Sequence, residues 1–328
     1  MSYAERIHSA AAAELARRRD AAEKAQQARH SHVLAILPDI AVLEQELAMD
    51  GLAVVKAIGM GKDAAAFIEE LSKSNLEKQR KIKEALVSNG FAADYLEVKY
   101  ACPLCNDSGF IGGIACECFK SLLNTLADAE LNETAPASEC GFENFRLDYY
   151  PDQYNENIKS SIRERMSKIY DYCKNYAEDF DESSPSLFMY GATGLGKTHL
   201  SLAIASTATK AGYNVIYRSA QNLLRQLEKE RFNSRGNDEN SFEEEILNCD
   251  LLIIDDLGVE FSTQFTVAAI YNIINSRLNS RRPTIISSNL TDDELEAKYT
   301  QRVTSRIVGN FVPLLFLGKD IRQLKKFY

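Results

Sequence analysis

The sequence contains no long apolar run, no excess of positive charge and no internal repeat. A membrane-spanning helix needs about 18 or more consecutive apolar residues, so none is expected here. The first residues lead into a charged, helix-like stretch rather than an apolar signal core, which argues against secretion. We therefore expect a cytoplasmic protein that does not enter a membrane.

The net charge of −9 at neutral pH argues against a broad basic surface that coats nucleic acid, since nonspecific DNA affinity comes mainly from Lys and Arg at phosphates. Any DNA contact must be local or assembled from several subunits. Hydrophobic residues make up 45% and charged residues 26%, as in soluble globular proteins, and 328 residues suffice for about two domains.

Residues 1–95 are expected to form an α-helical domain. Apolar residues recur at three- and four-residue spacing through Ala10–Arg29, Val33–Ala48 and Asp63–Val87, in stretches rich in good helix formers. Breaks are expected near Pro38 and around Gly51 and residues 59–61. These helices either pack on one another or provide a docking surface for a partner, and the sequence favours neither reading.

Residues 96–125 are expected to form a small zinc module. Four of the seven cysteines lie in two close pairs, Cys102 with Cys105 and Cys116 with Cys118. Four thiolates suit tetrahedral Zn²⁺ and leave no open coordination position, so the metal should be structural. In a reducing compartment this reading outweighs disulfides, and the alternatives are unrelated thiols or a redox or iron–sulfur role. The isolated cysteines are expected as small core residues: Cys140, Cys173 and Cys249.

After a linker at residues 126–150, short apolar runs alternate with helical segments, and residues 151–328 are expected to form one domain. This alternation predicts an α/β fold with a parallel sheet covered by helices on both faces. Five strands are expected, at Leu187–Tyr190, Asn214–Arg218, Leu251–Asp255, Thr284–Ser288 and Val312–Leu317.

A P-loop follows the first of these strands and opens a helical run, which is the context that the motif requires. Glycines let successive N–H groups point at phosphate oxygens, and the helix contributes its positive N-terminal end. Lys197 should reach the β- and γ-phosphates of ATP, and the Thr198 hydroxyl should hold Mg²⁺. The expected nucleotide-binding residues are Gly191, Thr193, Gly194, Leu195, Gly196, Lys197, Thr198 and His199.

Two further strands end in polar residues at the same sheet edge. Asp255 and Asp256 close a buried apolar strand, where paired acids repel each other unless a cation lies nearby. With the P-loop they indicate a Walker B strand, with Asp255 on the Mg²⁺ side and Asp256 placed to orient or deprotonate the attacking water. Asn289 could bond the γ-phosphate or that water, or it could cap the helix that begins near Asp292.

The order of these elements resembles that in AAA+ ATPases. The amino-acid sequences of the motifs resemble those of bacterial and phage helicase loaders of the DnaC/DnaI type. The matching stretches are Gly-Leu-Gly-Lys-Thr-His-Leu (194–200), Leu-Leu-Ile-Ile-Asp-Asp-Leu-Gly (251–258), Ser-Ser-Asn-Leu (287–290) and Arg-Val-Thr-Ser-Arg-Ile (302–307). The resemblance runs from about Cys102 to the end of the chain. DnaI-type loaders also carry a comparable zinc module.

The resemblance implies roles for residues that would otherwise read as ordinary surface groups. Asn289 is similar to a sensor-1 residue, Arg306 to an arginine finger acting on a neighbouring subunit's ATP, and Arg322 to sensor 2, with Arg302 supporting Arg306. Hydrolysis would then depend on self-assembly into an ATP-bridged oligomer. One departure is Asp256, because AAA+ proteins usually carry Glu there, and its carboxylate lies roughly 1.5 Å farther from the water. Hydrolysis should be slow, with Glu260 as a fallback base.

The family implies binding of single-stranded DNA and of a replicative hexameric helicase. Phe232, Thr263 and Phe265 fall where related proteins contact single-stranded DNA, although both phenylalanines could equally be core residues. We expect a helicase loader with ATP, Mg²⁺ and Zn²⁺ as cofactors, whose N-terminal helices dock the helicase. The alternatives are an IstB-like helper ATPase of transposition, or a nucleotide-gated adaptor that scarcely hydrolyses ATP.

Overall fold

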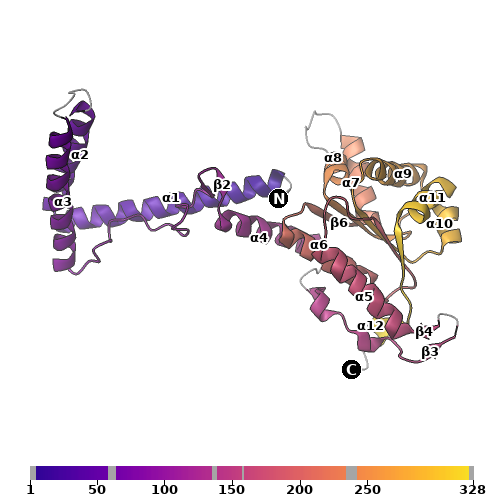
Figure 1. Cartoon of the computed structure of the whole chain (residues 1–328). Coiled ribbons are helices and arrows are strands. Elements are labelled where there is room, and N and C mark those ends of the chain that lie inside the picture. The colour runs from indigo at the N-terminus through magenta and orange to yellow at the C-terminus, as the bar shows by residue number, and fades with distance from the viewer. Residues whose placement is uncertain (1–4, 58–63, 135–138, 157–158, 234–241, 325–328) are drawn as a thin grey trace. The chain divides into compact units, whose positions relative to one another are not determined.

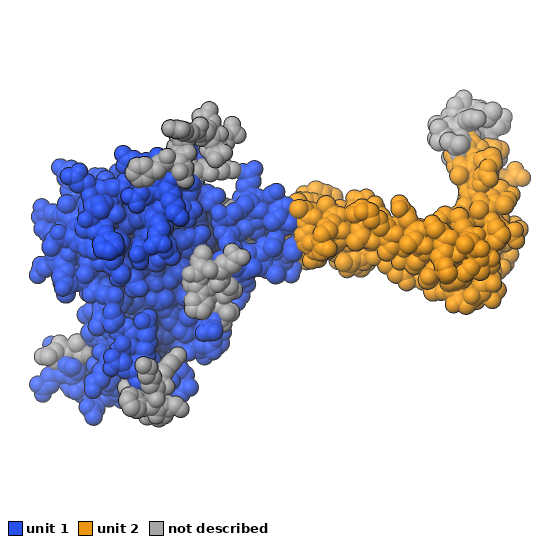
Figure 2. Space-filling model, turned by 180° about the vertical axis from the view of Figure 1, so that it is seen from behind, with its two compact units in different colours: residues 1–11, 121–328 blue, residues 12–120 orange. Residues whose placement is uncertain are grey.

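The computed structural model describes residues 5–57, 64–134, 139–156, 159–233 and 242–324. The chain divides into two compact units, Ala12–Lys120 and Met1–Ala11 together with Ser121–Tyr328 (Figure 2). None of the described helices is long and apolar enough to cross a membrane.

The smaller unit is mainly helical, as predicted for the N-terminal region. It contains most of α1 (Glu5–Ile36), then α2 (Asp39–Ala57) and α3 (Ala64–Ser88), which lie side by side (Figure 1). Val33, Ile40 and Leu86 form one buried cluster within it. The break expected near Pro38 separates α1 from α2.

The break expected at Gly51 is wrong, because α2 continues through it to Ala57. A single glycine costs a helix only about 1 kcal/mol, which tertiary contacts can offset. Here the Lys78 ammonium of α3 donates to the carboxylate of Asp50 at 2.7 Å and holds the adjacent turn against its neighbour. Residues 59–61, where a further break was expected, lie outside the described residues.

The cysteine-rich segment ends the smaller unit. Strands β1 (Phe110–Ile111) and β2 (Ile114–Ala115) pair antiparallel, and the first turn of α4 (Glu117–Thr134) follows. The cysteines and the N-terminal helices therefore fall within one compact unit. The proposed domain boundaries at residues 95, 125 and 150 stay predictions.

The larger unit is built on the five-stranded sheet that the sequence predicted, and all its strand pairs are parallel (Figure 1). The strands have the order β6-β7-β8-β5-β9. They comprise β5 (Leu187–Tyr190), β6 (Val215–Ser219), β7 (Leu251–Leu257), β8 (Thr284–Ser288) and β9 (Val312–Leu315). The α/β fold class is thus confirmed.

Helices cover both faces of the sheet because its strands are apolar on both sides. Along β7, Leu251 and Ile253 belong to one hydrophobic cluster, whereas Leu252 and Ile254 belong to the other. The first cluster packs under α5 (Ile162–Glu178) and α6 (Lys197–Ala211). The second packs under α7 (Ala220–Asn233), α8 (Phe242–Asn248), α9 (Gln264–Asn279), α10 (Asp292–Tyr299) and α11 (Gln301–Asn310).

Short elements complete the larger unit. They are η3 (Phe142–Asn144), η4 (Leu147–Tyr149), β3 (Tyr154–Asn155), β4 (Ser160–Ser161) and α12 (Ile321–Leu324). Two of the isolated cysteines, Cys173 and Cys249, are fully buried as expected, whereas Cys140 is only partly buried.

Candidate nucleotide-binding site

The P-loop joins the end of β5 to the start of α6 at the carboxyl edge of the sheet. Gly194 and Gly196 have φ angles of 73° and 90°, in the left-handed region that favours glycine. A Cβ on Gly194 would overlap the carboxylate of Asp320, and the Gly194 carbonyl accepts from the Ile321 N–H at 3.0 Å. The C-terminal segment is therefore fastened directly to the P-loop.

Lys197 is buried at the start of α6, with all three of its ammonium protons directed to oxygen. Its Nζ donates at 2.7 Å to each of the Gly191 carbonyl, the Ala192 carbonyl and the Asn289 Oδ1. Burial lowers the pKa of Lys197, and the charge of Asp256 opposes that shift. An ammonium group held by neutral acceptors at this position is available to a phosphate, which is a stronger acceptor because it is charged.

Thr198 and Asp255 meet at the same sheet edge. The Thr198 hydroxyl donates to Asp255 Oδ2 at 2.9 Å, and the carboxylate is 4% exposed. The same Oδ2 accepts from the Tyr217 hydroxyl at 2.6 Å, and Oδ1 accepts from the Ser287 hydroxyl. Hydroxyl and carboxylate oxygens are the hard ligands that Mg²⁺ prefers, so these residues fit that ion.

Asp256 projects into the cavity beside Lys197. Its φ of 53° lies in the left-handed region, which Asp tolerates better than most residues. Its backbone N–H donates to the Ser287 hydroxyl at 2.9 Å. Burial, and then the charge of Asp255, raise the pKa of the Asp256 carboxyl. Asn289, which also lines the cavity, does not cap α10, because Thr291 is the N-cap of that helix.

A cavity of about 320 Å³ opens over the P-loop. One wall comes from residues that the sequence singled out: Thr193, Gly194, Leu195, Gly196, Lys197, Thr198, His199, Asp256, Asn289 and Arg322. The other wall was not anticipated and comes mainly from the segment assigned to the linker: Cys140, Asn144, Phe145, Arg146 and Tyr149. The pair of phenylalanines in Phe142-Glu143-Asn144-Phe145 was the available signal for it.

This second wall is aromatic and is tied to the P-loop helix. Phe145 lies flat against Tyr170, with ring centroids 5.5 Å apart, and its ring stands edge-on to His199 at 5.4 Å. His199 Nε2 lies 2.8 Å from the Gly141 carbonyl oxygen. Phe145 also stacks on Tyr150, with ring centroids 5.9 Å apart, so an aromatic cluster packs against the P-loop and forms an apolar side of the cavity.

The predicted arginines fall in two places. Arg322 lines the cavity, whereas Arg306 is not among the described residues that do. On α11, Arg306 donates to Asn275 Oδ1 and to the Tyr271 hydroxyl, each at 2.9 Å, and its guanidinium carbon lies 4.6 Å from the Tyr271 ring centroid. Arg302, one turn earlier, is exposed beside a separate surface hollow.

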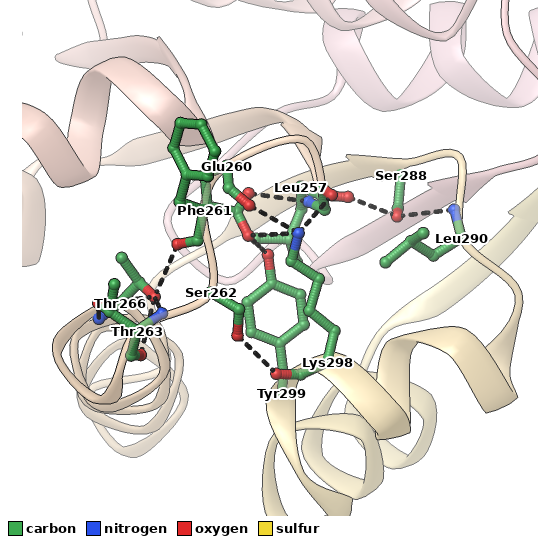
Figure 3. Close-up of polar contacts among 11 residues, drawn as sticks. Leu257, Glu260, Phe261, Ser262, Thr263, Thr266, Ser288, Leu290, Lys298 and Tyr299 are labelled. Carbon is green, nitrogen blue, oxygen red and sulfur yellow. Dashed lines mark hydrogen bonds and ion pairs between the residues drawn. The ribbon is translucent and has the colours of Figure 1, made fainter.

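Glu260 is not among the described residues that line the cavity, and it binds the loop after β7 to α10 (Figure 3). Its carboxylate is 4% exposed and accepts from the Tyr299 hydroxyl and, at 2.9 Å, from the Gly258 N–H. The Lys298 ammonium donates to the carbonyls of Gly258 at 2.6 Å and Glu260 at 2.7 Å. Both carboxylate oxygens of Glu260 are thus bonded away from the P-loop, and its expected role as a fallback base stays a prediction.

The expected DNA-contacting residues have different surroundings. Thr263 is exposed and caps α9 through a reciprocal pair of bonds with Thr266. Phe265 is partly buried against the core, with the Arg231 guanidinium 5.5 Å from its ring centroid. The side chain of Phe232 lies outside the described residues. Sequence reasoning missed Phe261, which is 85% exposed in the loop of Figure 3.

The four clustered cysteines converge in the smaller unit. The Sγ atoms of Cys102, Cys105, Cys116 and Cys118 lie within 4.8 Å of one another. Two of the separations, 3.8 Å and 3.4 Å, are close to the edge of about 3.8 Å that four Zn–S bonds of about 2.3 Å would give a tetrahedron.

A cation among these thiols would change their protonation. Backbone N–H groups lower the pKa of the Cys102 thiol to about 7, whereas burial and its neighbours raise that of Cys118. All four can be thiolates together only when a cation offsets their charge. The donor set fits zinc.

Comparison with known proteins shows that part of the larger unit is similar to proteins described as ATP-binding and as helicase loaders. Residues 172–308 match the family described as IstB-like ATP binding protein. The replicative helicase loader DnaC of Escherichia coli K12 is 28% identical over 178 residues, which cover 54% of this chain and 66% of that protein. The DnaC of Buchnera aphidicola from Acyrthosiphon pisum is 28% identical over 189 residues, covering 57% of this chain and 71% of the relative.

A crystal structure of the DnaC helicase loader is also similar, with 22% identity and a TM-score of 0.44, covering 54% of this chain and 98% of that one. In the sequence comparison, by contrast, the matched segment spans slightly less than two thirds of the length of E. coli DnaC. These matches confirm the resemblance to DnaC-type loaders and to IstB-like ATPases that the motifs indicated.

Proposed function

We infer that this chain is an AAA+ ATPase of the helicase-loader type, which binds a replicative DNA helicase and places it on single-stranded DNA in an ATP-dependent step. The observation that carries this inference is the sequence similarity to replicative helicase loaders named DnaC. The geometry supports it, because the motif residues assemble around one cavity. The proposed cofactors are ATP with Mg²⁺ and, in the smaller unit, Zn²⁺.

The proposed chemistry is attack of water on the γ-phosphate of ATP. Asp256 orients or deprotonates that water, and Asn289 lies beside Lys197, where it can hold the same water or a phosphate oxygen. Lys197 and Arg322 stabilise the negative charge that develops on the phosphate oxygens. Mg²⁺, when bound near Thr198 and Asp255, supplies Lewis-acid stabilisation of that charge.

Arg306 is proposed to act on the nucleotide of a neighbouring copy. Its support by Tyr271 and Asn275 fits this role, because an arginine that is prepositioned on its own subunit loses little conformational freedom on meeting a phosphate. Hydrolysis would then be slow in the free chain and stimulated by assembly. The working assembly is an ATP-bridged oligomer of this chain.

The loop that follows β7 is the proposed site of single-stranded DNA contact. Phe261 offers an exposed ring for base stacking, and Thr263 offers a hydroxyl near it. The N-terminal helices remain the proposed helicase-docking region, and the zinc site is proposed to hold the segment of the four cysteines in shape, since it leaves no coordination position for chemistry.

The test is affinity capture of the full chain from lysate of its source cells in the presence of ATP, with the Lys197→Ala variant as the matched control. A hexameric helicase retained by the full chain is the expected result, and its retention or loss with Lys197→Ala tells whether docking needs a bound nucleotide. The full chain is used because a cut near residue 95 would divide the compact unit Ala12–Lys120. Capture of no helicase would sink the loader proposal and leave the nucleotide site untouched.

A second candidate is a helper ATPase of DNA transposition, which the family match over residues 172–308 favours. Retention of a transposase in the same capture would favour this second candidate.

A third candidate function is an adaptor that binds ATP with little hydrolysis, which the short side chain of Asp256 favours. Steady-state ATP hydrolysis with and without single-stranded DNA separates it from an enzyme.

A further inference from the structure

Tyr217 belongs to no sequence motif considered above, yet it contacts the nucleotide site. It lies on β6, where it pairs with Ile253 of β7, and it is 5% exposed within the cluster under α5 and α6. Its hydroxyl extends toward the carboxyl edge of the sheet and donates to Asp255 Oδ2 at 2.6 Å. A buried tyrosine thus ends on the acid expected to hold Mg²⁺.

The hydrogen bond from Tyr217 helps to fix the orientation of the Asp255 carboxylate. Oδ2 accepts from both Tyr217 and Thr198, and Oδ1 accepts from Ser287, so both oxygens are fixed from three elements. A hydroxyl has one proton and two lone pairs. Because Thr198 gives its proton to Asp255, its lone pairs are left for a cation.

Tyr217 cannot exchange this partner for another without moving the strand that carries it. A helical Thr side chain can take either of two χ1 rotamers, whereas a phenol held in the core has its oxygen at one place. The hydroxyl therefore holds Oδ2 in the orientation that receives the Thr198 proton, even with Asp256 as a repelling neighbour. It donates a hydrogen bond to the carboxylate and provides no ligand atom to the metal.

We propose that Tyr217 is a positioning residue that sets the Mg²⁺ affinity of the nucleotide site by fixing the Asp255 carboxylate. This rests on the proposed function, in that the site must bind Mg²⁺ with a nucleotide. Partners of metal ligands typically change metal affinity by about 10- to 100-fold when they are removed. Tyr217→Phe deletes the hydroxyl and leaves the ring in the core.

Tyr176 supplies a matched control from the same hydrophobic cluster. Its hydroxyl is buried without a hydrogen-bond partner among the described residues, and it lies on α5 rather than at the nucleotide site. Tyr176→Phe therefore makes the same chemical change in the same core without touching Asp255.

The experiment measures binding of a fluorescent ATP analogue to the full chain, in chelator and across a Mg²⁺ titration. Tyr217→Phe should raise the Mg²⁺ concentration of half-maximal effect by about 10-fold and leave the affinity in chelator unchanged, whereas Tyr176→Phe should change neither. A Tyr217→Phe midpoint equal to that of the parent chain would overturn the proposal. So would loss of folding in Tyr217→Phe with Tyr176→Phe intact, because the hydroxyl would then be serving the core.

The assay distinguishes failure of the proposed function from failure of the proposed role of Tyr217. If the parent chain binds no nucleotide in Mg²⁺, the proposed function fails before Tyr217 is tested. If it binds and responds to Mg²⁺ while Tyr217→Phe responds equally, only the role of Tyr217 fails.

Discussion

Phe261 and Phe265 are close in sequence but lie in different surroundings. Phe261 is 85% exposed in the loop before α9, while Phe265 packs against the core under that helix. The loop that displays Phe261 is held at its base by the buried Glu260, so the ring is presented from a fixed backbone (Figure 3). An exposed aromatic on a rigid loop suits base stacking, and a packed one does not.

Replacing Phe261 with Ala should therefore weaken binding of single-stranded DNA, because a stacked base contributes about 1–3 kcal/mol. Phe265→Ala should instead lower the free energy of unfolding by about 2 kcal/mol, less than a fully buried phenylalanine loses. Fluorescence anisotropy with a labelled oligothymidine and denaturant unfolding measure the two quantities. The opposite pattern, with DNA binding lost only in Phe265→Ala, would contradict this assignment.

The sequence predicted those site residues that the topology of the sheet brings together. Lys197, Asp256 and Asn289 come from three chain segments, and they meet because parallel strands end at one sheet edge. It did not reach the partners of Glu260, since Tyr299 lies 39 residues away and its approach depends on how α10 packs. The contact between Tyr217 and Asp255 was missed because it depends on strand register rather than on local pattern.

At the scale of elements, strands were predicted more closely than turns and walls. Buried strands of a parallel sheet read as apolar runs on both faces, and all five were found within a few residues. The wall at residues 140–149 was assigned to a linker, because its aromatic residues gain partners only from the P-loop helix and α5. Local composition does not predict contacts with segments that are distant in the sequence.

The turn that carries the cysteine pairs depends on one buried acid. Asp107 is 2% exposed and accepts from the N–H groups of Ala101 at 2.9 Å and Cys102 at 2.8 Å. Its φ of 54° is one that Asp and Asn both tolerate, so Asp107→Asn preserves the backbone but sets an amide N–H₂ against a backbone donor.

Asp107→Asn should therefore weaken Zn²⁺ binding by about 10-fold, as removal of a supporting partner commonly does. Competition with a chromophoric chelator measures the affinity of the full chain. Asp94→Asn is the control, since Asp94 forms an exposed ion pair with Lys99 outside the cysteine cluster. Unchanged zinc affinity in Asp107→Asn, or equal losses in both variants, would argue against this supporting role.

At the scale of the whole molecule, the proposed finger role of Arg306 would leave the nucleotide site of one chain incomplete. Lys197, Asp256 and Arg322 line the cavity, whereas Arg306 of the same unit is bonded to α9 and is not among the described residues that line it. An arginine that completes the site from a neighbour makes a head-to-tail contact between copies. Hydrolysis then becomes a property of an interface rather than of one chain.

Mixing two inactive variants tests this arrangement. Lys197→Ala lacks the ammonium for the phosphates, and Arg306→Ala lacks the proposed finger, whose loss typically costs 10³- to 10⁵-fold in rate. In an equal mixture, about a quarter of the interfaces pair an intact Lys197 with an intact Arg306 from the neighbour, so about a quarter of the parent ATPase rate should return. The double variant mixed with Arg306→Ala supplies no such arginine and should restore nothing. Because the two defects lie on different chains at each restored interface, recovery in the first mixture and not in the second requires that Arg306 act between copies; equal rates in both mixtures would place its action within its own chain.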